Sequence, residues 1–338
     1  MPVKVLAVDD SALIRSLMKE ILKGSSEFQL VGAARDPYEA RELIKRLNPD
    51  VLTLDVEMPK MDGLAFLQNL MRLRPMPVVM LSSLTEKGGE VAMRALELGA
   101  VDVVTKPKED LAHTFADLRE EILAKLRGAS KARVSALRSA VAPKKRSSLR
   151  LTHGLVAIGA STGGTEAIRQ VLAQFPADAP ATVVTQHIPS HFSRMFAKSL
   201  DAATSVRVKE AEEGEEFRPG HVYVAPGDRH LVVVKSGARF VARLDGGPAV
   251  NRHRPSVDVM FESLAKASPE NCVAVLLTGM GDDGARGLLA LRRMGAKTLA
   301  QDEESSVVFG MPKAAVQLGA AQAVIPLEDV ADRLLEAR

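Results

Sequence analysis

The chain has 338 residues, of which 46% are hydrophobic and 26% are charged, an ordinary composition for a globular protein. At about 150 residues per domain, this length predicts two domains. The formal net charge of +3 is too small to indicate, by itself, a nucleic acid or a membrane surface as the partner. The single cysteine, Cys272, excludes an intrachain disulfide and favours a reducing compartment.

The first part of the chain alternates short apolar runs with amphipathic stretches, which is typical of parallel strands joined by crossover helices. The apolar runs predict strands at 3–9, 28–34, 50–55, 77–81 and 100–107. Helical patterns occur at 11–24, 62–74, 88–99 and 109–126. The N-terminus enters a strand directly, and no apolar run approaches the ~18 residues of a membrane span. We therefore expect a cytoplasmic protein without membrane insertion.

A basic stretch follows this part. No acidic residue occurs between Glu121 and Glu166, whereas nine Lys and Arg residues do. The stretch 122–150 is either a basic arm for an acidic partner or a solvated linker whose first part continues the last helix. The linker is favoured, because no aromatic side chain alternates with the charges. We expect no nucleic-acid partner.

A second α/β pattern begins at about residue 151 and continues to residue 338. Its apolar runs predict buried parallel strands at 154–159, 181–186, 272–279 and 296–302. Between them, the segment 221–244 alternates apolar residues with Gly-rich turns, which predicts an inserted antiparallel hairpin. Cys272 starts one of the apolar runs, so it is interpreted as a small buried hydrophobic residue rather than a nucleophile.

Chemically reactive side chains end four strands of the first part. Asp9 and Asp10 end the first strand, Asp55 the third, Ser82 the fourth and Lys106 the fifth. Ligands collect outside the carboxyl ends of parallel strands, so these side chains are expected at one edge. Such carboxylates suit Mg²⁺, and a carboxylate can also accept a phosphoryl group. Lys106 and Ser82 could then pair with phosphoryl oxygens.

Four segments carry these residues: VDDS, LDVEMPKMDG, MLSS and TKP. As a set they resemble the signature of response-regulator receiver domains over residues 1–121. The resemblance implies a flavodoxin-like fold with Asp55 as the phosphoacceptor. It also implies that Asp9, Asp10 and Asp55 hold Mg²⁺ and that Ser82 and Lys106 contact the phosphoryl group. A sensor histidine kinase would be the phosphodonor.

In the second part, a glycine-rich turn joins an apolar run to a helical pattern. Residues 159–163 read Gly-Ala-Ser-Thr-Gly, which fits the nucleophile elbow G-x-S-x-G. There, Ser161 would present its hydroxyl at a sharp strand-to-helix turn. The same glycines could form a dinucleotide loop, although the G-x-G spacing is missing. The turn alone does not decide between the two.

A serine nucleophile needs a base. His187 follows the predicted strand 181–186, so it faces the same edge of the sheet as Ser161. His191 lies four residues after His187, but no glutamate stands between them as in a zinc protease, so zinc binding is not expected. His221 and His230 are expected at the surface or in turns of the hairpin region. His253 lies between two arginines and is a weaker candidate for a residue lining the cleft.

The base in turn needs an orienting acid, and Asp282 and Asp283 are the candidates. Both follow the apolar run 272–279 in a second glycine turn before a helix. Ser161, His187 and an aspartate therefore arise at strand ends on one face. Their order along the chain differs from that of α/β-hydrolases and of both serine protease types, which indicates a different fold with convergent chemistry.

Five segments of the second part form a further set: IGASTGG, QHIP, YVAPGDRHL, NRHRPSVDVMF and LLTGMGDDGARG. They resemble the catalytic domain of the chemotaxis protein-glutamate methylesterases of the CheB type. With the receiver-like part, the resemblance implies three regions: a receiver domain at 1–121, a linker at 122–150 and a doubly wound α/β methylesterase domain at 151–338.

Carried over by position, the resemblance makes Ser161 the nucleophile, His187 the base and Asp283 the orienting acid. Thr162 and Met280 would supply oxyanion contacts, largely through backbone N–H groups. The family often has Asn at the position of Asp282 in this chain, and the extra acid could change the local field.

The activity implied is hydrolysis of glutamyl methyl esters on the cytoplasmic helices of chemoreceptors, with glutamine deamidation as a second reaction and no cofactor for the esterase. Phosphorylation of the receiver would relieve its hindrance of the esterase cleft. A DNA-binding regulator would require a basic output module instead of the long α/β pattern. A dinucleotide-dependent oxidoreductase would require an acid at the end of the second strand, where His187 stands.

Overall fold

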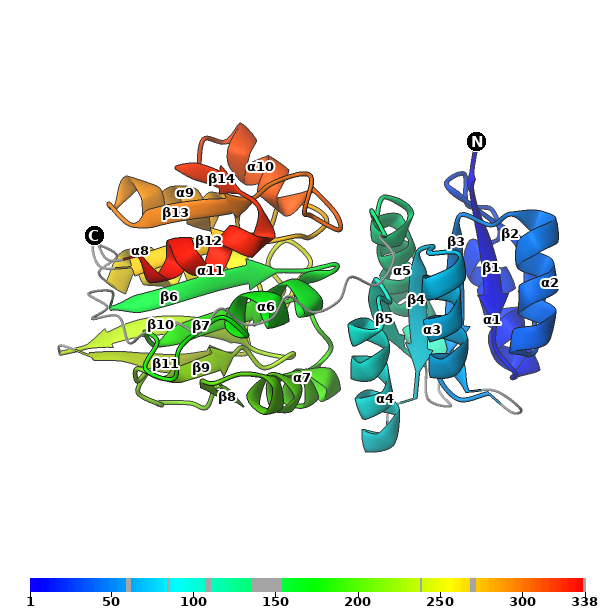
Figure 1. Ribbon diagram of the computed structural model, residues 1–338, viewed down its shortest axis with the longest axis horizontal. Helices are drawn as coiled ribbons and strands as arrows, with labels where there is room; N and C mark the ends of the chain where they lie inside the picture. Colours follow the sequence, from blue (N-terminus) through cyan, green and yellow to red (C-terminus); the bar gives the residue numbers. More distant parts are fainter. Residues whose placement is uncertain are drawn as a thin grey trace. The chain divides into compact units, whose positions relative to one another are not determined.

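The computed structural model describes residues 1–58, 62–83, 85–106, 111–134, 154–237, 239–267 and 272–336. The chain divides into two compact units, Met1–Ser139 and Ala140–Arg338 (Figure 1). Helix α5 (Leu111–Ser130) continues into the first part of the stretch predicted as a linker. Residues 135–150 of that stretch lie outside the described residues.

The first unit contains a parallel sheet of five strands in the order β2-β1-β3-β4-β5. The strands are β1 (Val3–Val8), β2 (Phe28–Ala34), β3 (Val51–Asp55), β4 (Val78–Ser82) and β5 (Asp102–Thr105). Strands β3 and β4 are buried along their whole length, as expected for strands covered on both faces. The predicted flavodoxin-like arrangement is confirmed.

Helices connect these strands. They are α1 (Ala12–Leu22), α2 (Pro37–Leu47), α3 (Gly63–Leu73), α4 (Glu86–Glu97) and α5. Local sequence sets their starts: the Asp36 carboxylate caps α2 and Pro37 occupies its first turn. The Arg119 guanidinium of α5 donates to the Ile21 carbonyl of α1 at 3.2 Å, so these two helices lie side by side.

The second unit contains a parallel sheet of seven strands in the order β14-β13-β12-β6-β7-β9-β8. The strands are β6 (Leu155–Ala160), β7 (Thr182–Gln186), β8 (Arg207–Glu210), β9 (His221–Val224), β12 (Cys272–Leu276), β13 (Lys297–Gln301) and β14 (Ala323–Ile325). Every residue of β6 and β12 is buried, Cys272 included. Fully buried parallel strands of this kind carry continuous apolar runs.

The segment 221–244 differs from its prediction in one respect. Only β10 (His230–Ser236) and β11 (Arg239–Asp245) form the antiparallel hairpin. Strand β9, which was predicted as part of that hairpin, pairs in parallel with β7 and β8 in the main sheet. The sequence of β9 alone is compatible with a hairpin strand. Its pairing with β7 and β8 in the structure shows that it belongs to the main sheet.

Helices cover both faces of the second sheet. They are α6 (Gly164–Leu172), α7 (Ser190–Ala203), α8 (Val257–Ala267), α9 (Ala285–Arg293), α10 (Met311–Gln317) and α11 (Leu327–Leu335). Helix α6 packs against α7 and α11, while α9 packs against α8 and α10. The sheet lies between these two layers (Figure 1), which confirms the predicted doubly wound fold.

The order of strands reverses between β6 and β12. Strands β7, β9 and β8 lie on one side of β6, and β12, β13 and β14 lie on the other. Open parallel sheets bind ligands outside the carboxyl ends of their strands at such a reversal. The loops that leave β6, β7 and β12 carry Ser161, His187 and Asp283, so the fold brings the three predicted residues to this point.

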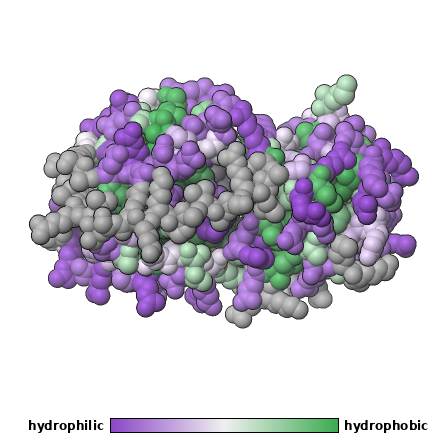
Figure 2. Space-filling view, in the orientation of Figure 1, coloured by the Kyte–Doolittle hydropathy of each residue, from purple (hydrophilic) through white to green (hydrophobic). Residues whose placement is uncertain are grey.

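Each unit buries its own apolar core. The core of the second unit joins β12 and α8 through Val257, Phe261, Ala274 and Leu276, all fully buried. On the face shown in Figure 2, hydrophilic residues cover most of the described surface. No helix of the described part of the chain is long and apolar enough to cross a membrane.

Candidate functional site

Ser161 lies at the turn between β6 and α6 and is buried. Its backbone N–H donates to the Thr278 carbonyl at 3.0 Å. Its own carbonyl accepts from the Gln186 side-chain amide at 2.8 Å and from the Gly164 N–H at 2.7 Å. These three bonds tie the serine backbone to the end of β7, the loop after β12 and the start of α6, and they fix the point from which the Ser161 side chain projects.

Two glycines allow the close approach around Ser161. Gly163 has φ +76°, a left-handed conformation that side chains other than glycine rarely adopt, and it forms the start of α6. A Cβ on Gly279 would lie only 2.8 Å from the Ser161 Cβ. Neither position tolerates a side chain without movement, so both turns depend on glycine.

His187 follows β7 directly and is buried between the serine and an aspartate. Its Nδ1 lies 3.0 Å from the Ser161 Oγ, and its Nε2 lies 2.8 Å from the Asp283 Oδ2. An ionised carboxylate only accepts hydrogen bonds, so Nε2 carries the proton and Nδ1 keeps a free lone pair. The imidazole can therefore accept the hydroxyl proton of Ser161.

The two adjacent aspartates have different environments. Asp282 is exposed, whereas Asp283 is buried with 2% of its surface accessible. Five groups donate to the Asp283 carboxylate: His187 Nε2, the Asn251 amide, the Ser256 hydroxyl and the backbone N–H groups of Val257 and Asp258. The structure therefore brings Asp283, and not Asp282, to His187.

These donors control the ionisation of Asp283. Burial alone would raise the pKa of its carboxyl, but the hydrogen bond from His187, with those from Asn251 and Ser256, outweighs it. The net effect holds the pKa of Asp283 below its usual range. The carboxylate stays charged and keeps the imidazole in the orientation that faces Ser161.

Acid should destabilise the second unit through this carboxylate. A group whose folded pKa is lowered contributes stability that is fully present above the unfolded pKa of ~3.9 and is lost as the pH falls toward the folded pKa. Below about pH 4, Asp283→Asn should therefore lose less stability per pH unit than the wild type, by up to about 1.4 kcal/mol per unit.

The intrinsic fluorescence allows this measurement on the second unit alone. The chain has two tyrosines and no tryptophan, and one of them, Tyr38, lies exposed in the first unit. In a Tyr38→Phe background, urea unfolding monitored at the buried Tyr223 reports the second unit. Parallel pH dependences for Asp283→Asn and its parent would show that the native carboxyl has no lowered pKa.

Thr162 and Met280, the predicted oxyanion residues, occupy the two turns that flank the serine. The Thr162 carbonyl accepts from the Thr278 hydroxyl at 3.0 Å, which ties the turn after β6 to the turn after β12. Met280 follows Gly279, whose carbonyl accepts from the backbone N–H groups of Gly310 and Met311 at 3.0 and 2.8 Å. Both turns are thus held next to Ser161, and their role as oxyanion donors stays a prediction.

Residues that the sequence did not assign support this arrangement. Asn251 and Ser256 were not predicted as partners of Asp283, although both lie in the segment NRHRPSVDVMF. The expectation for His230 was wrong: it is buried, accepts from the Ser256 N–H at 3.1 Å and lies 3.0 Å from the Pro248 carbonyl. His253 stacks on the His187 ring.

In the first unit, three acids converge at the carboxyl ends of β1 and β3. Ligand oxygens of Asp9, Asp10 and Asp55 all lie within 4.8 Å of one another. The Lys106 ammonium lies 2.9 Å from Asp9 and 2.7 Å from Asp55. Three carboxylates against one ammonium leave an excess of negative charge, and oxygen ligands of this kind fit Mg²⁺.

Burial changes the ionisation of this cluster. It raises the pKa of Asp55 to about 6, with the nearby Asp9 charge adding to the increase and Lys106 opposing it. Burial alone would lower the pKa of Lys106, but its bonds to the Asp55 and Asp9 carboxylates outweigh that and raise it. Lys106 therefore keeps its charge beside the predicted phosphoacceptor.

Ser82, the predicted switch hydroxyl, makes a different contact. It is buried at the end of β4, and its Oγ donates to the Gly88 carbonyl of α4 at 2.8 Å. An interaction with a phosphoryl group on Asp55 would require this bond to break first.

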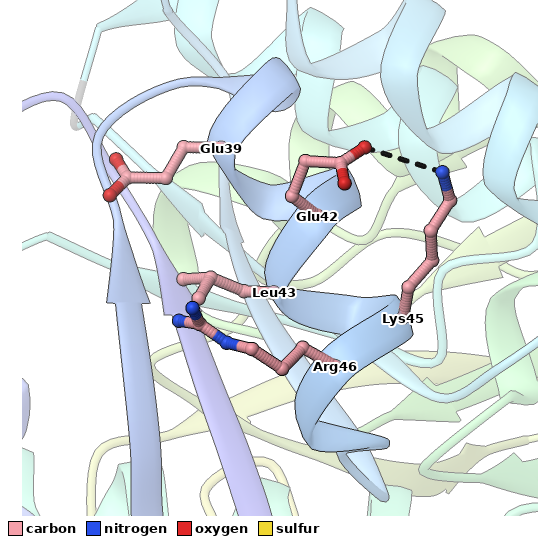
Figure 3. Close-up of a pocket in the computed structure, with 5 residues that line it drawn as sticks. All are labelled: Glu39, Glu42, Leu43, Lys45 and Arg46. Atoms are coloured by element: carbon pink, nitrogen blue, oxygen red, sulfur yellow. Dashed lines mark hydrogen bonds and ion pairs between the residues drawn. The ribbon is translucent and has the colours of Figure 1, made fainter.

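A surface hollow lies along α2 of the first unit. Figure 3 shows that its lining side chains all come from α2: Glu39, Glu42, Leu43, Lys45 and Arg46. The volume is about 450 Å³, and Glu42 and Lys45 form an exposed ion pair at 3.3 Å along its rim. None of the predicted site residues contributes to it, so it takes no part in the chemistry of either cluster.

Comparison with known proteins agrees with this geometry. Residues 5–116 match the family model of the response regulator receiver domain, and residues 156–334 match that of the CheB methylesterase. The protein-glutamate methylesterase/protein-glutamine glutaminase of Bordetella bronchiseptica is 57% identical, over 98% of this chain and 96% of that protein. A protein of the same description from Xanthomonas oryzae pv. oryzae is 56% identical, over 99% of this chain and 97% of that protein.

A solved structure matches the second unit. The crystal structure of the Thermotoga maritima CheB methylesterase catalytic domain shares 37% sequence identity with this chain and has a TM-score of 0.53. The match covers 55% of this chain and 98% of that domain. The likeness extends along almost the full length of the domain that carries Ser161, His187 and Asp283.

Proposed function

The chain belongs to the CheB methylesterase family, and we propose that it hydrolyses glutamyl methyl esters on methyl-accepting chemoreceptors under the control of its receiver domain. One observation carries this proposal: His187 connects the Ser161 hydroxyl to the buried Asp283 carboxylate at the strand reversal of the second sheet. A serine, a base and an orienting acid in this arrangement support nucleophilic acyl transfer.

The first step forms an acyl-enzyme. The Ser161 Oγ attacks the ester carbonyl carbon while its proton passes to His187 Nδ1. Nε2–H remains bonded to Asp283, whose negative charge stabilises the imidazolium that forms. Backbone N–H groups of Thr162 and Met280 are proposed to receive the negative oxygen, an effect worth roughly 3 kcal/mol per donor in acyl transfer. The C–O bond then breaks, and methanol leaves with the proton from Nδ1.

The second step reverses these roles. Water gives a proton to His187 Nδ1 and attacks the glutamyl-serine carbonyl. The Ser161 oxygen leaves with that proton, which releases a glutamate side chain. A glutamine amide can follow the same route, since only the leaving group changes from methanol to ammonia. We therefore include glutamine deamidation in the proposed function.

Regulation is assigned to the acidic cluster of the first unit. Asp55 is proposed to accept a phosphoryl group from a sensor histidine kinase, with Asp9 and Asp10 holding Mg²⁺ beside it. When bound, Mg²⁺ would neutralise negative charge on the phosphoryl oxygens. Lys106, already 2.7 Å from Asp55, would pair with one of these oxygens. A phosphoryl group adds about two negative charges at this edge of the sheet.

Asp55→Asn should abolish the response to a small phosphodonor while leaving basal esterase activity intact. The amide has the shape of the carboxyl but cannot form the acyl phosphate. Methanol release, measured with and without acetyl phosphate and Mg²⁺, checks this expectation. Asp117→Asn removes an exposed acid of α5 and serves as the charge control. Equal stimulation of Asp55→Asn and the control would show that the switch lies elsewhere.

The esterase assignment is tested by methanol release from a receptor fragment that carries glutamyl methyl esters. Ammonia release from the same fragment with glutamine at those sites tests deamidation separately. We expect both products from the wild type. An enzyme that acts on simple esters but on neither receptor fragment would contradict the proposed substrate.

A further inference from the structure

A second histidine ring contacts the proposed base. The rings of His253 and His187 are stacked, with centroids 3.6 Å apart and an angle of 14° between their planes. His187 is thus held at its edge by Ser161 and Asp283 and on its face by His253. The acyl-transfer steps above make no use of this face contact.

A tight turn delivers His253 to this position. The backbone N–H and carbonyl groups of Val250 and His253 are paired at 2.9 and 3.0 Å. The two residues between them, Asn251 and Arg252, have φ +51° and +67°. Left-handed backbone at residues other than glycine is uncommon, and where it persists it clusters at functional sites.

The same turn also contacts the acid. The Asn251 amide donates to Asp283 Oδ1 at 2.7 Å and to Asp258 Oδ2 at 2.8 Å. Arg286 in turn donates to the side-chain Oδ1 of Asn251 at 2.6 Å. One short turn therefore holds both the base and its orienting acid.

We propose that His253 is a positioning residue that fixes the tilt of the His187 imidazole. Hydrogen bonds at Nδ1 and Nε2 tolerate small changes in the side-chain torsions of His187, and such changes tilt the ring. A flat ring stacked on its face, with centroids 3.6 Å apart, restricts this tilt. This inference rests on the proposed function.

The proposal predicts a loss of rate with retained binding. His253→Ala should lower kcat by about 10- to 100-fold, the effect of a small misplacement of a catalytic group, and should change KM by less than about threefold. His253→Phe, which restores a flat ring, should recover kcat to within about threefold of the wild type. His253→Leu fills the space without a flat ring, so its kcat should stay low.

A measurement that needs no receptor substrate separates this inference from the proposed function. The rate at which a fluorophosphonate labels Ser161 depends on the base but not on the identity of the natural substrate. We expect His253→Ala and His253→Leu to label about 10- to 100-fold more slowly than the wild type, and His253→Phe to label at close to the wild-type rate. His221→Ala is the matched control. His221 is the first residue of β9 and so lies at the amino ends of the parallel strands, opposite the carboxyl ends that carry Ser161 and His187.

The outcomes are distinct. Slow labelling of the alanine and leucine variants, with recovery in the phenylalanine variant, supports the positioning role. Wild-type labelling rates in the alanine and leucine variants would overturn it. So would a phenylalanine variant that is labelled as slowly as the alanine variant. Circular dichroism compares the folding of the variants, and the leucine variant replaces the alanine variant if the latter is unfolded. Normal labelling without methanol release from the receptor fragment would contradict the proposed substrate and leave the positioning result valid.

Discussion

Replacing Ser161 by alanine is expected to reduce methanol release by roughly 10⁶-fold in kcat, the size of the loss when the nucleophile of a serine hydrolase is removed. The structure explains why no other group can substitute. His187 Nδ1 lies 3.0 Å from the Ser161 Oγ, and its other nitrogen is engaged by Asp283. Without the hydroxyl, the base would have to activate water in a site shaped for a serine oxygen.

The fold should survive this change, because the bonds that hold the turn come from the Ser161 backbone. Its N–H and carbonyl are paired with Thr278, Gly164 and the Gln186 side chain. Ser236→Ala, in an exposed position at the end of β10, is the matched control. Methanol release by a folded Ser161→Ala enzyme at the control rate would rule out the serine as nucleophile.

Asp283→Asn is expected to lower kcat by about 10⁴-fold. The carboxylate accepts on both oxygens: His187 Nε2 and the Val257 N–H bind Oδ2, whereas Asn251 and Ser256 bind Oδ1. An amide offers only one accepting oxygen. If its NH₂ group faces His187, it donates to Nε2 and moves the imidazole proton to Nδ1, where the base can no longer accept the serine proton.

The alternative orientation is also unfavourable, because the NH₂ group would then face the Asn251 donor. Asp282→Asn is a matched control one residue away, since that side chain is exposed. Methanol release and fluorophosphonate labelling of both variants measure the contrast. Equal losses in the two variants would show that burial and hydrogen bonding do not distinguish the neighbouring acids.

The main sheets were predictable because burial on both faces leaves continuous apolar runs. β6 and β12 show this pattern along their full length. β8 does not, because only one of its four residues is buried, and β14 has only three residues. Both lie at the edges of the sheet, where partial exposure removes the apolar signal, and neither was predicted.

The positions of the chemical groups were predictable at the strand ends, but their partners were not. Ser161 and His187 directly follow strands, so topology alone places them at one edge. The choice between Asp282 and Asp283 rested on a family resemblance, because their local sequence contexts are alike. In the structure, the choice depends on donors from residues 251–258, which are 25–32 positions away along the chain.

His230 is a second residue whose environment depends on partners that are distant along the chain. A histidine beside a glycine turn is expected at the surface, yet here it is 2% exposed. Its ring is satisfied by the Ser256 N–H and the Pro248 carbonyl, both distant along the chain. Hydrogen bonds of this kind offset the cost of burying a polar ring, and no local sequence pattern predicts them.

The central claim is that Ser161 forms a covalent bond with the glutamyl side chain of the substrate. Its most direct test is an acid-quenched single turnover of a methyl-esterified receptor peptide, followed by mass spectrometry of the digested enzyme. The account predicts methanol in step with a peptide adduct on the fragment that contains Ser161. Methanol formed without an adduct, or with an adduct on another residue, would contradict it.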